Sequence, residues 1–306
     1  MLYELIIIGG GPAAITAGIY AARKKVKTLL ICADWGGQMA YAPDIENYPG
    51  FEKITGIELV NKFKQHLKNY PIEILEHIRV EKIETISGDN PIFKIRTLKG
   101  EEFQTRAVIV ATGKVPRKLN IPKEEEFIGK GISFCAICDA PLYKDKVVAV
   151  IGGGNSGCDS SLLLSQYAKK IYILQFGPNL TCDVSTREKI RENKKIQVIT
   201  NAQVKEIYGD KFIKGVKYQD RTSKEIKNLD IDGLFIAIGS LPASHPIKEM
   251  IKLNEDGEII IDKNNMTSQK GIFAAGDVTD VCFKQIIIAA GEGAKAALSV
   301  CKYLGK

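Results

Sequence analysis

The sequence predicts an α/β protein made of two related units, each with a parallel β-sheet and helices packed against it. The main observation is an internal repeat, in which residues 5–31 align without a gap on residues 148–174. A second, shorter repeat relates residues 106–117 to residues 232–243. The third observation is a C-terminal stretch, residues 270–304, which has no counterpart in the second unit.

The long repeat shows the same order of patterns in both copies. An apolar run comes first, and a glycine cluster, a stretch with helical periodicity and a second apolar run follow it. A strand, a phosphate-binding loop, a helix and a second strand open a Rossmann-like dinucleotide-binding domain in this order. We therefore expect two such domains in one chain.

The remaining segments predict how the two domains are arranged. Alternating apolar and polar residues at 93–112 and 215–239 indicate small antiparallel β crossovers that lead back into each parallel sheet. The C-terminal stretch has the pattern of a strand, a turn and a long helix, which we expect to complete the first domain. The predicted fold class is two three-layer, Rossmann-like domains, the second inserted in the first, with residues 1–115 and 245–306 in one and 116–244 in the other.

The first glycine cluster, residues 9–14, fits the pattern G-x-G-x-x-A. Gly9 permits a tight turn, Gly11 lets a pyrophosphate approach the backbone, and the small Ala14 lets the helix pack close to the strand. The helix N-terminus then offers N–H groups and positive potential to the phosphates. Because the loop follows a strand, precedes a helix and recurs, dinucleotide binding is favoured over a purely structural turn.

The second glycine cluster, residues 152–157, fits G-x-G-x-x-G. About 20 residues later, an acid binds the ribose of NAD, whereas a nearby arginine takes the 2′-phosphate of NADP. Gln175 stands there instead, and its carboxamide is able to hydrogen-bond a ribose hydroxyl. The nearest arginine in sequence, Arg187, lies well beyond this position.

Cys135 and Cys138 form a C-x-x-C motif that is followed directly by Asp139. A structural zinc site needs four ligands, and the chain has one such motif and three isolated histidines. A structural disulfide across so short a loop adds little stability and is uncommon in the cytosol. A redox-active dithiol next to a βαβ unit is the favoured interpretation, with Asp139 as proton donor and acceptor. Electrons would pass from a nicotinamide to a flavin, then to this disulfide and then to a substrate disulfide.

Composition excludes several classes of function. The net charge of +7 comes from scattered lysines and arginines, which is more typical of a solvated surface than of nucleic-acid binding. Apolar runs are too short to cross a membrane, and no signal peptide is recognisable, so we expect a cytoplasmic protein. The scattered cysteines are expected to be buried, reduced and inert: Cys32, Cys158, Cys182, Cys282 and Cys301.

A series of motifs along essentially the whole chain resembles a known family. They are "GGGPAA", "GGQ", "ENYPGF", "ATGKVPR", "CAICD", "GGGNSG", "GIFAAGD" and "KQIIIAAGEGAKAA". Together they resemble the low-molecular-weight thioredoxin reductases, which are class-II pyridine nucleotide-disulfide oxidoreductases, and the related flavoprotein module of alkyl hydroperoxide reductase. The resemblance implies an FAD-dependent thioredoxin-disulfide reductase that is fed by NADH or NADPH.

The resemblance also implies roles for individual residues. The first domain would bind FAD and the second the pyridine nucleotide, with Cys138 facing the flavin, Cys135 attacking the partner and Asp139 managing the proton. The FAD residues would be Gly9, Gly11, Pro12, Ala13, Gly36, Gly37, Gln38, Asn47, Ala111, Thr112, Gly113, Asp277, Lys284, Gln285 and Ile286. The NAD(P) residues would be Gly152, Gly154, Asn155, Ser156 and Gln175. No metal site is expected.

Departures from the family pattern bear on the electron donor and the partner. Gln175, Phe176 and Gly177 replace a His-Arg-Arg type of cluster, so we expect NADH to be favoured, as in the peroxidase-reductase branch. Because Met1 begins directly at the flavin strand, the electrons are expected to go to a separate small dithiol protein, either thioredoxin- or glutaredoxin-like or part of a peroxiredoxin system. A homodimer is implied by the resemblance. The alternatives are a reductase fed by another donor such as ferredoxin, and a redox sensor without turnover.

Overall fold

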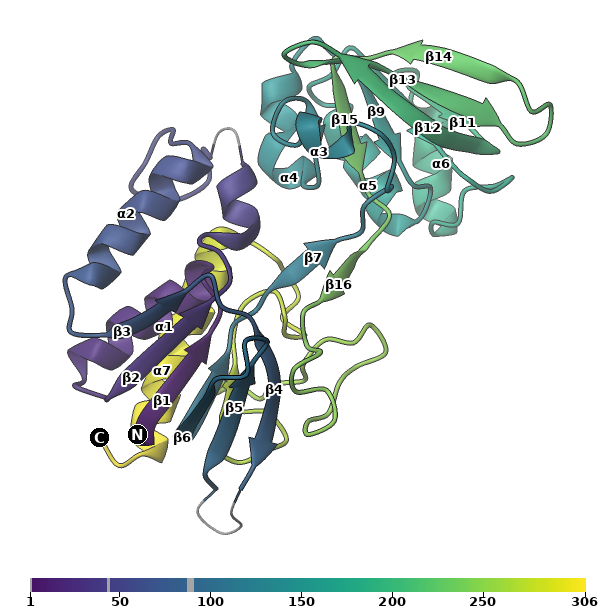
Figure 1. Ribbon diagram of the computed structural model, residues 1–306. Helices are drawn as coiled ribbons and strands as arrows, with labels where there is room; N and C mark the ends of the chain where they lie inside the picture. Colours follow the sequence, from purple (N-terminus) through teal and green to yellow (C-terminus); the bar gives the residue numbers. More distant parts are fainter. Residues whose placement is uncertain (1, 43–44, 87–90) are drawn as a thin grey trace. The chain divides into compact units, whose positions relative to one another are not determined.

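The computed structural model describes residues 2–42, 45–86 and 91–306 (Figure 1). It divides into two compact units, and the predicted α/β class with two Rossmann-like domains is confirmed. The first unit comprises Met1–Ala40, Ile54–Val115 and Leu241–Lys306, and the second comprises Tyr41–Lys53 and Pro116–Ser240. Within the described ranges, no helix is both long enough and apolar enough to cross a bilayer.

The first unit holds the N- and C-terminal parts of the chain. Its elements are β1 (Leu2–Ile8), α1 (Pro12–Arg23), β2 (Thr28–Cys32), η1 (Gly37–Tyr41), α2 (Gly56–Lys68), β3 (Glu73–Glu76), β4 (Val80–Thr85), β5 (Phe93–Thr97), β6 (Glu102–Val110), β7 (Lys114–Pro116), β17 (Ile272–Ala274) and α7 (Ile286–Tyr303). Two of these, η1 and β7, end at the first residue of a second-unit segment.

The sheet of the first unit has the strand order β3-β2-β1-β6-β5-β4, and β17 also pairs with β6. The strands β3, β2, β1, β6 and β17 are parallel, whereas β4 and β5 extend the sheet in antiparallel fashion. From β1 the chain first adds β2 and β3 on one side of the sheet and later adds β6 on the other side of β1. The direction in which strands are added therefore reverses at β1. In open parallel sheets, ligands bind beyond the carboxyl ends of the strands at such a reversal.

Both faces of this sheet are covered, which explains why β1 is a continuous apolar run. Leu5 and Ile7 pack on one face with α1 and α7, and Ile6 and Ile8 pack on the other face with β5 and the segment around Ile259. Figure 1 shows α1 and α7 side by side, although they lie at opposite ends of the sequence. The C-terminal stretch therefore belongs to the first unit.

The second unit repeats the plan of the first. Its elements are α3 (Glu124–Phe127), β8 (Ile132–Ser133), α4 (Ala136–Asp139), η2 (Ala140–Tyr143), β9 (Val147–Ile151), α5 (Asn155–Leu164), β10 (Lys170–Leu174), α6 (Val184–Glu192), β11 (Ile196–Ile199), β12 (Ala202–Gly209), β13 (Ile213–Asp220), β14 (Ile226–Asp230) and β15 (Gly233–Ile236). The short strand β16 (Ser240–Pro242) begins at the last residue of this unit and continues into the first. A parallel sheet, β11-β10-β9-β15-β8, stands beside an antiparallel sheet, β12-β13-β14. The strands β9, β10, β11 and β15 correspond to β1, β2, β3 and β6.

The two units differ from the predicted domains in two places. The predicted second domain ends at residue 244, and the predicted first domain runs without interruption from residue 1 to residue 115. Residues 241–244 group with the first unit, where the Ala243 N–H donates to Gly113 O (2.9 Å) and Thr112 Oγ1 donates to Ala243 O (2.8 Å). The segment Tyr41–Lys53 groups with the second unit. Sequence patterns did not indicate this grouping, because it depends on contacts between distant segments.

Candidate functional site

The first glycine loop has a backbone that only small residues permit. Gly9 has φ +134°, and a Cβ atom on it would lie 2.2 Å from Ala111 O. A Cβ atom on Gly11 would meet nothing closer than Gly36 O at 3.9 Å. The protein itself therefore requires glycine at position 9, whereas the space beside Gly11 is open to a ligand.

The N-terminus of α1 suits an anionic ligand. Its N-cap residue, Gly11, supplies no side-chain hydrogen bond to the first turn, and Pro12 occupies the first helical position. By contrast, α2 begins with a complete capping box formed by Thr55 and Glu58. The N–H groups at the start of α1 thus have no side-chain cap, and such groups bind phosphate well.

Further open space surrounds the loops that follow β2 and β6. Gly37 has φ +52° and Gly113 has φ +71°, and a Cβ atom on either would meet nothing within 4 Å. Gln38 bridges these loops, since its Nε2 donates to Lys114 O (2.9 Å). Together with the uncapped α1, this cradle fits the pyrophosphate and flavin of FAD, which would lie against residues 9–13, 36–38 and 111–113.

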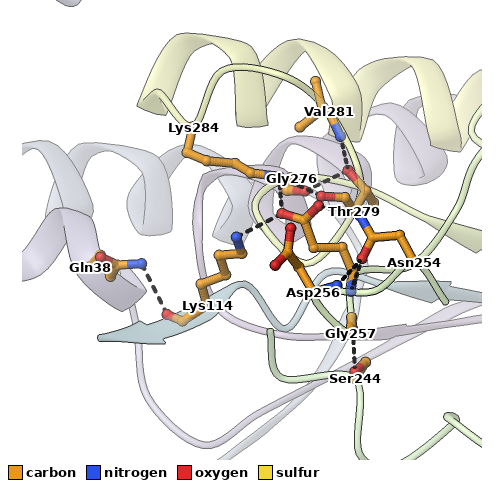
Figure 2. Close-up of polar contacts among 11 residues, drawn as sticks. Gln38, Lys114, Ser244, Asn254, Asp256, Gly257, Gly276, Thr279, Val281 and Lys284 are labelled. Atoms are coloured by element: carbon orange, nitrogen blue, oxygen red, sulfur yellow. Dashed lines mark hydrogen bonds and ion pairs between the residues drawn. The ribbon is translucent and has the colours of Figure 1, made fainter. Parts of the chain in front are cut away.

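A charged cluster lies next to this cradle (Figure 2). Glu258 Oε1 lies 2.6 Å from Lys114 Nζ and 3.1 Å from Lys284 Nζ, and Glu258 Oε2 accepts a hydrogen bond from Asn254 Nδ2 (2.7 Å). Burial raises the pKa of Asp277 above its ordinary value, and the charges of Lys284 and Lys114 oppose that rise. Asp277 therefore lies within the electrostatic reach of both lysines.

The other predicted FAD residues are distributed around the same edge of the sheet. Asp277 follows β17, and Lys284, Gln285 and Ile286 lead into α7, for which Gln285 is the N-cap residue. Asn47 differs, because it belongs to the segment that groups with the second unit. All the predicted FAD residues except Asn47 therefore lie in the first unit.

The second glycine loop has nearly the same backbone as the first. Gly154, the N-cap residue of α5, has φ −82° and ψ −176°, against −83° and −176° for Gly11. Gly152 has φ +113°, and a Cβ atom on it would lie 2.4 Å from Ala237 O. Ser156 is exposed, and Asn155 Oδ1 accepts a hydrogen bond from the Asp183 N–H (2.9 Å). This loop suits a second dinucleotide.

Gln175 is bonded to the main chain on both ends of its carboxamide. Its Oε1 accepts from the Gly153 N–H (2.9 Å), and its Nε2 donates to Asn179 O (3.0 Å). The side chain thus ties the glycine loop to the turn after β10. A role toward a ribose would come in addition to this structural one.

Arg221 is a residue that the sequence analysis missed. Its Nη1 donates to Phe176 O (3.0 Å), and its guanidinium carbon lies 3.9 Å from the centroid of the Phe176 ring. Arg187, which the sequence did single out, instead donates from Nη2 to Cys182 O (2.8 Å). Arg221 brings a positive charge to the strand end that reads the ribose in Rossmann-like domains. No local pattern indicates a contact between residues 45 positions apart.

Cys135 and Cys138 form a disulfide at the start of α4, with their Cα atoms 5.3 Å apart. The Cys138 N–H donates to Cys135 Sγ (3.2 Å), and Ile137 between them is 64% exposed. A backbone N–H directed at a sulfur favours its thiolate form. The motif is therefore partly exposed, with both cysteines half-buried, and in the reduced pair this N–H would favour a thiolate at Cys135.

Asp139 is buried directly behind this disulfide. Ser133 Oγ donates to Asp139 Oδ2 (2.6 Å) and accepts from the Cys135 N–H (3.0 Å). Ser133 thus links the carboxylate to the backbone of the first cysteine, a role that the sequence analysis did not assign. In the sequence, the only sign of this role is that Ser133 lies two residues before Cys135.

The remaining cysteines are distributed as expected, with one exception. Cys32, Cys158, Cys182 and Cys301 are buried, whereas Cys282 is exposed. Burial raises the pKa of Cys32 and that of Cys158 to about 12, so neither is a ready nucleophile. Across residues 2–42, 45–86 and 91–306, no group of three or more His, Cys, Asp or Glu residues is placed to hold a metal ion.

Comparison with known proteins identifies relatives that belong to the reductases. A model of the family described as pyridine nucleotide-disulphide oxidoreductase matches residues 3–293. The chain is 40% identical over 303 residues to the F subunit of alkyl hydroperoxide reductase in Escherichia coli (strain K12), covering 99% of this chain and 58% of that protein. For the protein of the same name in Staphylococcus aureus (strain MRSA252), the identity is 41% over 302 residues, covering 99% and 59%. The chain thus spans less than two thirds of the length of these relatives.

Solved structures are similar over nearly their full length. A thioredoxin reductase from Streptococcus pyogenes MGAS5005 matches with a TM-score of 0.93 and 34% identity, covering 99% of this chain and 98% of that one. A thioredoxin reductase from Giardia duodenalis matches with a TM-score of 0.90 and 31% identity, covering 100% and 99%.

Proposed function

The chain belongs to the pyridine nucleotide-disulphide oxidoreductase family, and from this premise we propose that it is an FAD-dependent thioredoxin-disulfide reductase. Electrons would pass from a nicotinamide donor through FAD to the Cys135–Cys138 pair and then to a dithiol protein. The observation that carries the proposal is the partly exposed Cys135–Cys138 disulfide in a chain with two dinucleotide loops.

The residues around the disulfide suit thiol–disulfide exchange. With the pair reduced, the Cys135 thiolate attacks a partner disulfide, and a mixed disulfide forms as one partner thiolate leaves. Cys138 then attacks Cys135, releases the second partner thiolate and restores the internal disulfide, so that two electrons have moved to the partner. Asp139, held by Ser133, exchanges the proton with the leaving thiolate. FAD, when bound, supplies the two electrons that reduce the pair again.

The proposed donor is NADH. Gln175, at the end of β10, carries no charge to bind a 2′-phosphate. Arg221, beside Phe176, is the group that would favour NADPH instead. The two nucleotides therefore have to be compared on the intact protein and on an Arg221 variant.

The proposed partner is a small disulfide protein. The names of the relatives refer to alkyl hydroperoxide reductase and thioredoxin reductase, so a peroxiredoxin system and a thioredoxin-like protein are both suitable classes. A homodimer and a cytoplasmic location belong to the proposal and rest on the sequence resemblance and pattern alone.

Replacing Cys138 by serine tests the function. We expect Cys138→Ser to retain FAD, because Cys138 is not among the residues of the flavin cradle, but to lose NADH-dependent reduction of thioredoxin-like proteins. Cys282→Ser is the matched control, since Cys282 is exposed and lies outside the pair. Normal disulfide reduction by Cys138→Ser would contradict the proposed function.

Anaerobic titration of the oxidised flavoprotein tests the donor. We expect NADH to bleach the flavin absorbance at a lower concentration than NADPH. If NADPH is the better donor, and Arg221→Gln removes that advantage, then Arg221 selects the donor and the NADH assignment is wrong. If neither nucleotide bleaches the flavin, a different electron carrier feeds the protein.

A further inference from the structure

We propose that the cluster of Lys114, Glu258 and Lys284 sets the reduction potential of the bound flavin through its net charge. The inference rests on the proposed function only in requiring that the chain binds FAD. It concerns residues to which neither the fold nor the motif pattern gives an electrostatic role.

The cluster is compact and shielded from water. Glu258 Oε1 contacts both lysines, at 2.6 Å from Lys114 Nζ and 3.1 Å from Lys284 Nζ. The exposed fractions of the side chains are 12% for Glu258, 15% for Lys114 and 25% for Lys284. Ion pairs that are partly buried are much less screened by salt than exposed pairs. The charges therefore act over several ångströms around the cluster.

The cluster carries one surplus positive charge. Two ammonium groups share one carboxylate, whose second oxygen accepts from the neutral amide of Asn254. Asp277 is a further acid in electrostatic contact with both lysines, and it offsets this charge where it is ionised. The inference therefore concerns the change in charge that each substitution makes, which does not depend on Asp277. Asp277 is also one of the residues that the sequence resemblance assigns to FAD.

Several segments of the proposed flavin cradle are connected to this cluster. Gln38 donates to the carbonyl oxygen of Lys114, and Lys114 directly follows the open space at Gly113. Lys284 directly precedes Gln285, the N-cap residue of α7. Figure 2 shows Lys114 and Lys284 converging, with Gln38 bonded to the backbone of Lys114. A flavin held by these segments would lie within reach of the charges of the cluster.

The sign of the effect follows from the charge. A two-electron-reduced flavin at neutral pH carries one more negative charge than the oxidised form, so a positive environment stabilises the reduced state and raises the potential. Removing a lysine should lower the potential, and removing the carboxylate should raise it. A purely structural role would disturb the cradle in both variants and would not give shifts of opposite sign.

The experiment compares Lys114→Met and Glu258→Gln with the wild type, each as the purified flavoprotein. Each protein is equilibrated anaerobically with a reference redox dye, and the visible spectra report the reduced fractions of flavin and dye. We expect the flavin–dye equilibrium to shift about tenfold toward oxidised flavin in Lys114→Met and about tenfold the other way in Glu258→Gln, each equal to about 30 mV for a two-electron couple. Lys252→Met, which removes an exposed lysine of the same unit, is the control and should leave the equilibrium unchanged.

The possible outcomes separate this inference from the proposed function. Shifts in the same direction in both variants, or shifts no larger than that of the control, overturn the inference. Failure of the wild type to bind FAD overturns the proposed function and the inference with it, whereas bound FAD with unchanged potentials overturns the inference alone. If Lys114→Met does not retain FAD, Lys114→Gln keeps a polar side chain and should shift the equilibrium in the same direction.

Discussion

Gly9 and Gly11 stand two residues apart in one loop, yet glycine is needed at them for different reasons. At Gly9 the positive φ and the Ala111 carbonyl, 2.2 Å from the Cβ position, exclude a side chain in the folded protein itself. At Gly11 the backbone is extended and a Cβ atom would have room. The fold does not exclude a side chain at position 11, so we expect that a need for glycine there would come from the dinucleotide.

This difference predicts opposite behaviour of two alanine variants. Gly11→Ala should change the stability of the apoprotein by no more than about 1 kcal/mol, because alanine restricts the unfolded chain but is a poorer N-cap residue than glycine. Its affinity for FAD should fall at least about tenfold, since the pyrophosphate has to approach this position closely. Gly9→Ala should destabilise even the apoprotein, by about 2 kcal/mol or more.

Urea denaturation of the apoproteins and fluorescence titration with FAD measure the two effects. Unchanged FAD affinity in Gly11→Ala would show that the phosphates do not lie at this loop. A wild-type stability for apo Gly9→Ala would contradict the backbone geometry.

At the scale of single elements, the packing of α7 on α1 positions the first glycine loop. Gly293 lies within α7, and a Cβ atom on it would lie 2.1 Å from the carbonyl oxygen of Ala13. Gly276, after β17, approaches the same residue, with its Cβ position 3.0 Å from the Ala13 Cβ. The C-terminal helix and the β17 turn thus pack directly on the start of α1, where phosphates would bind.

Gly293→Ala should therefore destabilise the protein. Helix propensity alone favours alanine over glycine by about 1 kcal/mol. A backbone contact at 2.1 Å outweighs that gain, because α7 has to move away from α1, and overpacking of this kind costs about 1–3 kcal/mol. Weaker FAD binding should accompany the loss, because Ala13 belongs to the loop.

Thermal unfolding of the apoprotein and FAD titration check this prediction. Gly291→Ala is the matched control in the same helix, since a Cβ atom there would meet nothing within 4 Å. The control should be stabilised, and a stabilised Gly293→Ala would show that α7 does not pack so closely.

At the scale of the whole molecule, several carboxyl groups have pKa values below their ordinary values. Burial alone would raise the pKa of Glu258, but hydrogen bonds from Lys114, Asn254 and Lys284 lower it below 4.5 overall. The unfolded chain therefore binds a proton at Glu258 at a higher pH than the folded protein does. The corresponding stability is present above about pH 4.5 and is lost as the pH falls through the folded-state pKa.

The free energy of unfolding should accordingly fall as the pH is lowered from about 6 toward about 3. The Glu258→Gln variant should show a smaller fall over the same range, because one of the groups that take up a proton on unfolding has been removed. Its stability at about pH 7 should be lower than that of the wild type, since both lysines lose their shared carboxylate.

Urea denaturation at a series of pH values measures both curves. An equal fall in the variant and the wild type would mean that Glu258 is not preferentially ionised in the folded protein. Asp277 contributes in the opposite sense, because burial raises its pKa.

Much of this architecture could be predicted from local patterns. The two glycine loops, the strands and helices that flank them, and the cysteine motif each depend on residues a few positions apart. Backbone conformation and the spacing of apolar residues are local properties, so they can be recognised in the sequence. The roles assigned to the individual site residues remain predictions.

Other features could not be predicted from local patterns. Gln175 folds back onto Gly153 and Asn179, and Arg221 reaches Phe176 across 45 positions. The sequence suggested a ribose contact for the first residue and nothing for the second. The contact of Arg221 depends on how the turn between β13 and β14 returns to the end of β10.

The sequence by itself determined the chemical character of this protein: two loops that can accept a dinucleotide, and a dithiol placed between them in the chain. Only the tertiary structure decided which charges surround these groups. Lys114 and Lys284 meet because the loops beyond β6 and β17, far apart in the sequence, lie where those neighbouring strands end. Glu258 joins both lysines from the segment before β17, where Ile259 pairs with Thr279. The order of the strands in the sheet decides which loops lie next to one another. Charged side chains on neighbouring loops then interact through space, however far apart they are in the sequence.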